Sequence, residues 1–413
     1  MLPNLRCVLP AMMLIGLAGP VCADVITDWN EKTIAIVTAR TMLPPQAERV
    51  VATVHVAMFD AVNSIERRYL PYRAQLPAAK ETSKEAAAAA AAAAVLAALL
   101  PNAADEMKAA LAAYLAPMPG GPAKDDGIKL GEAVAAKIAA ERAKDGASAS
   151  DSYRPKTKPG VYVPTPITAS SMWPNVAPFA MTGPAQFRPQ PPIPLNGEEW
   201  ARDYNEIKSL GVKTSTTRST RQSEDGRFWL VTGPASYYPI VRQLVAAKQM
   251  NLVDSARFMA LTSVATADAF IAVFDAKYHY DFWRPITAIR NGDTDDNPAT
   301  ERDATWQPID NTPMHPEYPC AHCITSAAVA AVAEALLGSA NVPELVMTSP
   351  TAPGVTHRWT NLWVYADEVA LARIWAGFHY RFSTRVGQDM GRKIGRFVAE
   401  KIMRPAAVAD ATR

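Results

Sequence analysis

The chain has 413 residues, of which 49% are hydrophobic and 20% are charged, and its formal net charge is +2. This composition excludes a disordered chain and supplies enough apolar mass for one large core or two smaller ones. A nearly neutral chain without long basic runs argues against nucleic acid as a partner, and four cysteines are too few for a disulfide-built scaffold.

Residues 1–23 have the pattern of an export signal. Arg6 gives a weak positive start, and the apolar stretch 8–19 is too short to span a bilayer. Small residues at 21–23 stand where a signal peptidase cleaves, so the mature chain should begin at Asp24. A short membrane anchor is the alternative. We expect a periplasmic or secreted protein without a transmembrane helix in the mature chain.

Residues 24–151 are expected to form the first helical part of the chain. Apolar residues recur at three-to-four spacing over 34–65, with a break at Pro44-Pro45. Residues 85–100 are almost all alanine, the best helix former, and leucines near their end favour a packed helix over a low-complexity linker. Two further helices are predicted at 107–115 and 129–143.

The amino-acid composition changes at residues 152–197, which are rich in proline. Proline removes backbone donors and disfavours helix for the residue before it. The segment nevertheless keeps Tyr162, Trp173, Phe179 and Phe187, and a solvated linker would seldom contain so many aromatic residues. We predict an ordered, extended strap packed on a helical body.

Residues 198–413 are expected to form a C-terminal helical bundle. The stretch 254–280 is apolar on nearly every side, as in a buried helix. No alternation of strand and helix, no phosphate-binding glycine loop and no repeat is apparent. The predicted fold class is all-α, with helices at 198–210, 226–232, 238–250, 254–280, 323–337, 361–375 and 384–402.

The first motif of chemical interest joins Lys277 to Arg284, which is followed by Pro285. Seven residues are two helical turns, so a continuous helix would place both cations on one side. Buried like charges need an anion between them. The alternative is that Asp275 and Asp281 pair with them.

Two further motifs each contain a histidine. Pro319-Cys320-Ala321-His322 precedes an apolar helix, and free N–H groups at a helix N-terminus favour an anion; a purely structural turn is the alternative. Arg373 and His379 are six residues apart, and Gly377 offers a break that could bring His379 back toward Arg373. Otherwise His379 is a core residue. Fixed cations with two imidazoles suit a site that holds an oxyanion, where one histidine bonds the central atom and the other moves protons.

Taken in order, Lys277-x6-Arg284-Pro285, Pro319-x-x-His322 and Arg373-x5-His379 resemble the signature of the vanadium-dependent haloperoxidases and the type-2 phosphatidic acid phosphatase (PAP2) superfamily. The flanking sequences DAKYHYDFWRPITAIR, HPEYPCAHC and GFHYRF resemble the haloperoxidase branch, in its exported bacterial form. The resemblance is clear over about residues 198–398.

This resemblance implies two four-helix bundles and a vanadate cofactor, for which phosphate is a mimic. It implies that His379 is the axial ligand to vanadium, or the nucleophile if phosphate is the substrate, and that His322 is the general acid/base. The partners would be hydrogen peroxide, halide and a small organic substrate, or a phosphate monoester hydrolysed through a phosphohistidine. The implied oxyanion-binding residues are Lys277, Arg284, Cys320, Ala321 and Arg373.

The chain departs from the family pattern at several positions. Cys320-Ala321 stands where the family usually has Ser-Gly, and a thiol is a weaker donor than a hydroxyl. Where the family has a serine before the third cation, this chain has Ala372. Where the family has an aspartate four residues after the last histidine, this chain has Ser383. We expect four residues to contact the oxyanion-binding side chains without contacting the oxyanion itself: His315, Ser383, Asp275 and Asp281.

Cys320 and Cys323 permit a different interpretation. Cys-x-x-Cys at a helix start resembles the redox pair of thioredoxin-like oxidoreductases, although no strands are predicted around it. Within an oxyanion site the pair would either form a disulfide or stay as two buried, protonated thiols, and we expect the thiols. An oxyanion-binding protein without turnover is the remaining alternative.

Overall fold

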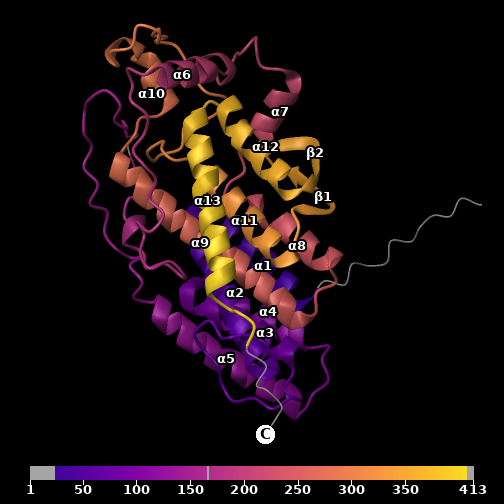
Figure 1. Cartoon of the computed structure of the whole chain (residues 1–413). Coiled ribbons are helices and arrows are strands. Elements are labelled where there is room, and N and C mark those ends of the chain that lie inside the picture. The colour runs from indigo at the N-terminus through magenta and orange to yellow at the C-terminus, as the bar shows by residue number, and fades with distance from the viewer. Residues whose placement is uncertain (1–23, 165–166, 407–413) are drawn as a thin grey trace, which may run out of the picture.

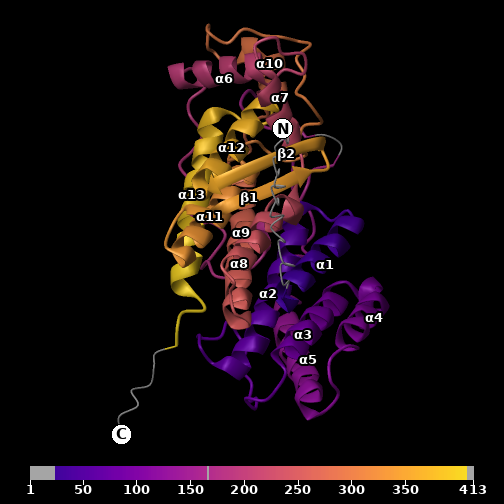
Figure 2. The same ribbon diagram turned by 90° about the vertical axis from the view of Figure 1, so that its right-hand side faces the viewer.

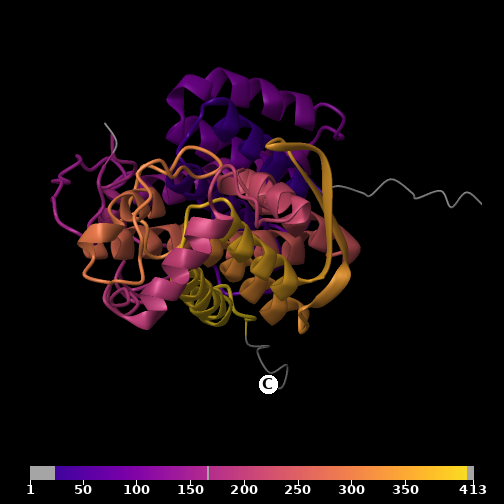
Figure 3. The same ribbon diagram turned by 90° about the horizontal axis from the view of Figure 1, so that it is seen from above.

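The computed structural model describes residues 24–164 and 167–406, so the expected signal sequence at 1–23 lies outside the described residues. The fold is mostly helical, with a two-stranded sheet, which confirms the predicted fold class (Figure 1). Seen from above, the helices from the first third of the chain lie on one side of the C-terminal helices (Figure 3).

The N-terminal part is built from helices whose ends follow local sequence signals. Asp24 caps α1 through its side chain, which accepts from the Thr27 N–H at 2.9 Å. Pro44 opens α2, where proline is favoured because the first N–H groups of a helix have no partner. The elements are α1 (Val25–Ala39), α2 (Pro44–Glu66), α3 (Lys84–Leu99), the 3-10 turn η1 (Pro101–Ala103), α4 (Ala104–Leu115) and α5 (Pro122–Arg142).

The alanine-rich α3 is a core helix, not a linker. A Cβ atom added at Gly131 of α5 would stand 2.2 Å from the carbonyl oxygen of Ala87, so the two helix backbones almost touch. Only residues as small as alanine and glycine permit this approach, and the alanines at 86–93 are buried.

The proline-rich strap is ordered over its described residues, 152–164 and 167–197, and runs along one side of the molecule (Figure 1). Trp173, in the 3-10 turn η2 (Trp173–Asn175), is buried. The carboxylate of Asp268 accepts the N–H groups of Phe179, Ala180 and Met181 at 2.6–2.9 Å. These backbone bonds attach the strap to the core helix that carries Asp268.

That core helix is α9 (Leu252–Tyr280), which packs against α2, α11 and α13. Within the described residues it is the one helix long and apolar enough to cross a membrane, but its most apolar window is fully buried inside the protein. The other elements of this part are α6 (Glu198–Leu210), α7 (Thr220–Phe228), η3 (Gly233–Ser236), α8 (Tyr238–Ala247), α10 (Pro285–Arg290), η4 (Gly292–Thr294), α11 (Ala321–Leu337), α12 (Leu362–Trp375) and α13 (Arg381–Lys401).

An antiparallel hairpin of β1 (Asn341–Ser349) and β2 (Ala352–Asn361) joins α11 to α12, and the sequence did not predict it. It lies against α7, α8 and α12 (Figure 2). Pro343 and register shifts at both ends of the ladder interrupt the simple alternation that would reveal a strand pair.

Helices α11 and α13 pack as closely as α3 and α5 do. A Cβ atom added at Gly387, Gly391 or Gly395 would stand 2.6, 2.0 or 2.6 Å from the carbonyl oxygens of residues 320, 324 and 328, respectively. The glycines recur every four residues and therefore share one face of α13. This contact fixes the N-terminal end of α11, where Ala321 and His322 lie.

Candidate oxyanion site

A cavity of about 300 Å³ opens between the start of α2 and the ends of α11 and α12. Leu43 and Pro44 form part of its apolar wall, together with Phe270 and Phe274 of α9. Its polar wall contains His315, Ala321, His322, Arg373 and His379. Residues from the second and third sequence motifs therefore reach one region, whereas Lys277 and Arg284 of the first motif do not line this cavity.

His379 comes back over the end of α12 because the chain turns at Gly377. Gly377 has a φ of +81°, a conformation that residues with a Cβ rarely adopt. The N–H groups of Phe378 and His379 both donate to the carbonyl of Arg373, at 3.0 and 3.3 Å. The break predicted from Gly377 is present and brings the two motif residues together.

The ring contacts of His379 determine its tautomer. Nε2 lies 3.3 Å from Nη1 of Arg284, and Nδ1 lies 2.8 Å from Oε1 of Glu317. A guanidinium can only donate, so Nε2 accepts and Nδ1 carries the proton that is donated to Glu317. Burial lowers the pKa of His379 well below its usual value, and the Arg284 charge lowers it further. The ring is thus neutral, with its lone pair on Nε2.

Glu317 is the residue that the sequence analysis missed. Its side chain is fully buried, and Oε1 also accepts the N–H of Tyr380 at 3.1 Å. Burial raises its pKa to about 7, although the charges of Lys277 and Arg284 oppose the shift. A glutamate five residues before His322, in an otherwise apolar and proline-rich segment, was the available signal. It supplies the carboxylate beside His379 in a chain that has Ser383 where the family has aspartate.

Lys277 and Arg284 lie behind the cavity wall. The Lys277 ammonium donates to the carbonyls of Pro316 and Glu317 at 2.9 and 2.7 Å. Arg284 donates to the carbonyls of His315 and Phe378 at 2.9 and 3.0 Å. Burial lowers the pKa of Lys277 well below its usual value and that of Arg284 to about 10. Both cations thus hold the backbone on either side of His379.

Arg373 and His322 lie in the cavity wall and bond to one loop. Nη1 of Arg373 donates to the Trp229 carbonyl at 2.5 Å, and Nε2 of His322 lies 3.0 Å from the Val231 carbonyl. A carbonyl only accepts, so Nε2 of His322 carries a proton and Nδ1 is left as its acceptor. Burial lowers the pKa of Arg373 to about 9, and burial with the Arg373 charge lowers that of His322 well below its usual range.

Two of the four expected supporting residues lie at the site. Nδ1 of His315 lies 2.9 Å from Nη2 of Arg284, and the carbonyl of buried Ser383 accepts the N–H of Cys320 at 3.3 Å. Burial, together with the charges of Lys277 and Arg284, lowers the pKa of His315 well below its usual value.

The expected support from Asp275 and Asp281 is wrong. Asp275 forms a two-bond ion pair with Arg188 of the strap, at 2.7 and 2.8 Å. Asp281 accepts the hydroxyl of Tyr153 at 3.0 Å. Asp275 precedes Lys277 by two residues, about 200° around α9, so the carboxylate and the ammonium project to different sides. The two aspartates attach the strap instead of pairing with Lys277 and Arg284.

The expectation of two buried thiols is also wrong, because Cys320 and Cys323 form a disulfide. Cys320 is the N-cap of α11, and its Sγ still accepts the N–H of Cys323 at 3.2 Å. Cys320 therefore has no S–H to donate to an oxyanion. Both sulfur-bearing side chains are completely buried, which argues against thiol exchange with another protein.

The site fits a tetrahedral oxyanion such as vanadate. Lys277, Arg284 and Arg373 are buried and form no ion pair among the described residues, and the Glu317 carboxylate acts on the charges of Lys277 and Arg284 without bonding to them, so positive charge is in excess. Nε of Arg373 is buried without a hydrogen-bond partner in the described structure. An oxyanion would accept this N–H and would reverse the depression of the cation pKa values, because an opposite charge favours the ionised forms.

Comparison with known proteins relates part of the sequence to one family. Residues 257–407 match the VCPO second helical-bundle domain. The chain is 25% identical over 268 residues to the vanadium chloroperoxidase of Curvularia inaequalis, an alignment covering 48% of this chain and 43% of that protein. The chain thus spans less than half the length of this curated relative.

Solved structures share the fold over most of the chain. A bacterial vanadium-dependent iodoperoxidase superposes with a TM-score of 0.79 at 23% identity, covering 92% of this chain and 97% of the other. A bacterial vanadium-dependent chloroperoxidase superposes in its apo form with a TM-score of 0.69 at 17% identity, covering 87% and 94%. The architecture is that of the vanadium haloperoxidases, and the match of residues 257–407 to the VCPO second helical-bundle domain, with the sequence similarity to the curated chloroperoxidase, supports a place in their superfamily.

Proposed function

We propose that this protein is a vanadate-dependent haloperoxidase that oxidises halide with hydrogen peroxide. The observation that carries the proposal is the neutral ring of His379, which Glu317 orients through Nδ1 so that Nε2 keeps its lone pair. An imidazole ligand held by a carboxylate on its other nitrogen is the usual arrangement at a protein-bound metal centre.

Vanadate would be held by Nε2 of His379 beside Arg373 in the cavity wall, with the Ala321 N–H at the start of α11 as a further donor, while Lys277 and Arg284 behind the wall add positive charge. When bound, it supplies a Lewis-acid centre that activates peroxide toward halide. Nδ1 of His322 is a free acceptor in the cavity wall, so this residue can take a proton from incoming hydrogen peroxide and return one to the leaving oxygen.

The same residues support a phosphatase as the second candidate. The Glu317 carboxylate would favour attack of His379 Nε2 on the phosphorus of a monoester, because it stabilises the positive charge that the ring gains. His322 would protonate the leaving alkoxide, and water would then hydrolyse the phosphohistidine. The apolar wall of the cavity suits a small organic group in either reaction.

One preparation distinguishes these functions. Vanadium content and oxidation of iodide, bromide and chloride are measured after vanadate loading, and p-nitrophenyl phosphate hydrolysis is measured on vanadate-free protein. Stoichiometric vanadium with halide oxidation supports the haloperoxidase. Hydrolysis without halide oxidation supports the phosphatase, and tight oxyanion binding with neither activity would leave a binding protein.

We further propose that the protein is exported and acts in the periplasm or outside the cell. Asp24, which directly follows the predicted cleavage position, caps α1 with its own side chain, so a chain that begins there would keep this helix start. Intact-mass measurement of protein recovered from outside the cytoplasm should give a chain that begins near Asp24. A chain that retains Met1 would contradict this prediction.

A further inference from the structure

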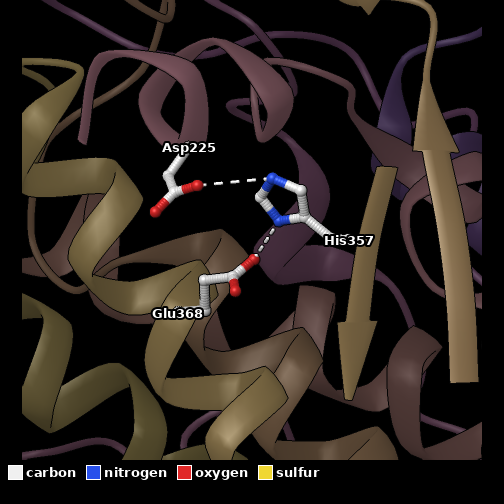
Figure 4. Close-up of side chains that lie close together, drawn as sticks. All are labelled: Asp225, His357 and Glu368. Carbon is white, nitrogen blue, oxygen red and sulfur yellow. Dashed lines mark hydrogen bonds and ion pairs between the residues drawn. The ribbon is translucent and has the colours of Figure 1, made fainter. Parts of the chain in front are cut away.

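A second polar cluster lies outside the cavity and joins three elements. Asp225 of α7 and Glu368 of α12 lie on opposite sides of the imidazole of His357, which comes from β2 (Figure 4). Nδ1 of His357 is 2.5 Å from Oε1 of Glu368, and Nε2 is 3.3 Å from Oδ1 of Asp225. The ring is 1% exposed and stacks on Phe228 with the centroids 3.9 Å apart. The hairpin is thus attached to both helices through one buried side chain.

The partners of this cluster favour a structural connection over a metal ion. The two ring nitrogens face different carboxylates, and one ion cannot occupy both sides of an imidazole. Glu368 also accepts the indole N–H groups of Trp229 and Trp359 at 3.0 and 3.1 Å. The Arg221 guanidinium lies 2.8 Å from Oδ1 of Asp225 and supplies a positive charge without any metal.

The cluster leads directly to the oxyanion site. α7 ends at Phe228, and the next residues form a loop from Trp229 to Val231. Glu368 holds the side chain of Trp229, while the Trp229 carbonyl accepts Arg373 and the Val231 carbonyl accepts His322. Two cavity-wall residues from different helices are therefore held by carbonyls two positions apart in one loop.

The hairpin also binds the backbone at Phe228, directly before this loop. The Phe228 carbonyl accepts the hydroxyl of Ser349 at 2.7 Å and that of Thr351 at 3.1 Å. Within the described residues, the 228–231 backbone thus bonds to the hairpin on one side and to the oxyanion site on the other. A displacement of this loop would move the acceptors of Arg373 and His322 together.

We propose that His357 is a positioning residue: it fixes the 229–231 loop between α7, α12 and the hairpin, so that the loop carbonyls set the orientation of Arg373 and the tautomer of His322. The effect on turnover rests on the proposed function. The effect on oxyanion binding and on the His322 tautomer does not require any particular reaction.

The test uses His357→Gln in the full chain, with His55→Gln as its matched control. His55 is equally buried but contacts Asn30 and Tyr238, neither of which lines the cavity. The protein has only six histidines, so selective ¹⁵N-histidine labelling resolves each ring, with assignment by single substitution. Vanadate and inorganic phosphate affinities are measured by calorimetry on the same samples.

In the wild type we expect His322 to show one tautomer, protonated at Nε2. His357→Gln should produce a mixture of His322 tautomers and weaken vanadate and phosphate binding by about 10-fold or more, the usual effect of losing a supporting interaction. His55→Gln should lower stability while leaving the His322 spectrum and both affinities unchanged. A merely structural role for His357 would give two variants that behave alike.

Folded His357→Gln protein with an unchanged His322 tautomer and unchanged affinities would overturn the proposal. If that variant does not fold, Trp229→Phe serves instead, because it removes the indole N–H that Glu368 accepts and keeps the backbone carbonyl. Stoichiometric Zn²⁺ binding that His357→Gln abolishes would show a metal site and also refute the proposal. A wild type that binds neither oxyanion would refute the proposed function, whereas the His322 tautomer change would still support the role of His357.

Discussion

At the scale of single residues, Glu317 has the largest expected influence on the chemistry of His379. Glu317→Gln keeps the shape of the side chain but removes the charge that holds the Nδ1–H of His379. We expect vanadate affinity to fall by about 10- to 100-fold, the range found when a supporting partner of a metal ligand is lost. Calorimetry measures this directly.

The control for Glu317→Gln is Glu48→Gln. Glu48 is another fully buried glutamate, but its partners are Tyr238 and Thr266, neither of which bonds to His379 in the described structure. Vanadate affinity should be unchanged in this control. An equal loss in both variants would mean that a buried negative charge anywhere in the fold has the same effect.

The two histidines should separate binding from turnover. His379→Ala removes the only nitrogen expected to bond the central atom, so tight vanadate retention should be lost. His322→Ala leaves the three cations and His379 in place, so binding should largely persist while turnover falls by about 10²–10⁴-fold, the typical contribution of a general acid/base. Equal loss of vanadate binding in both variants would contradict this division of roles.

At the scale of elements, the glycine face of α13 sets the position of α11. Gly391→Ala would place a Cβ atom 2.0 Å from the Ile324 carbonyl, so the helices must separate. We expect a loss of about 1–3 kcal/mol or more in the free energy of unfolding, as for other overpacked contacts. Gly120→Ala is the control, because no atom lies within 4 Å of its added Cβ. Denaturant unfolding of both variants checks the prediction, and equal stabilities would contradict it.

Glu48 on α2 should make stability depend on pH. Burial raises its pKa from 4.5 to about 8, so the folded state binds this proton more tightly than the unfolded state. Its contribution is therefore complete below about pH 4.5 and is lost as the pH rises toward about 8. Relative to the wild type, Glu48→Gln should gain stability over this window because glutamine stays neutral. Urea unfolding at about pH 5 and pH 8.5 gives the difference, and a pH-independent difference would refute the assignment.

At the scale of the whole molecule, the sequence predicted the helical architecture because helix signals are local. The break at Pro44-Pro45, the alanine run of α3 and the apolar α9 all appear in the structure where the pattern indicated. The helix expected at 226–232 was displaced: α7 starts after Ser219, which forms a capping box with Gln222, and ends at Phe228. Residues 229–231 are therefore a loop and not part of a helix, and the carbonyls of this loop accept the hydrogen bonds of Arg373 and His322.

The non-local parts of the site were harder to predict. The order of the cations and histidines indicated a shared oxyanion site, and Gly377 indicated the turn that returns His379. Glu317 was not predicted because its role depends on its contact with His379, which is 62 residues away in the sequence. The pairing of Asp275 with Arg188 was missed for the same reason, as it joins α9 to the strap across 87 residues.

The disulfide between Cys320 and Cys323 has a consequence for the proposed haloperoxidase activity, which would use and form strong oxidants. A thiol beside the cavity would be converted stepwise to sulfenic and sulfinic acid, and each step would add polar atoms at the start of α11. Formation of the disulfide has already removed two electrons from the pair of thiols, one from each sulfur, and leaves neither sulfur as a thiolate that could attack peroxide. Within residues 24–164 and 167–406 no free thiol remains to consume peroxide or hypohalous acid. Under the proposed function, the turn that presents Ala321 and His322 therefore offers no thiol for peroxide to oxidise.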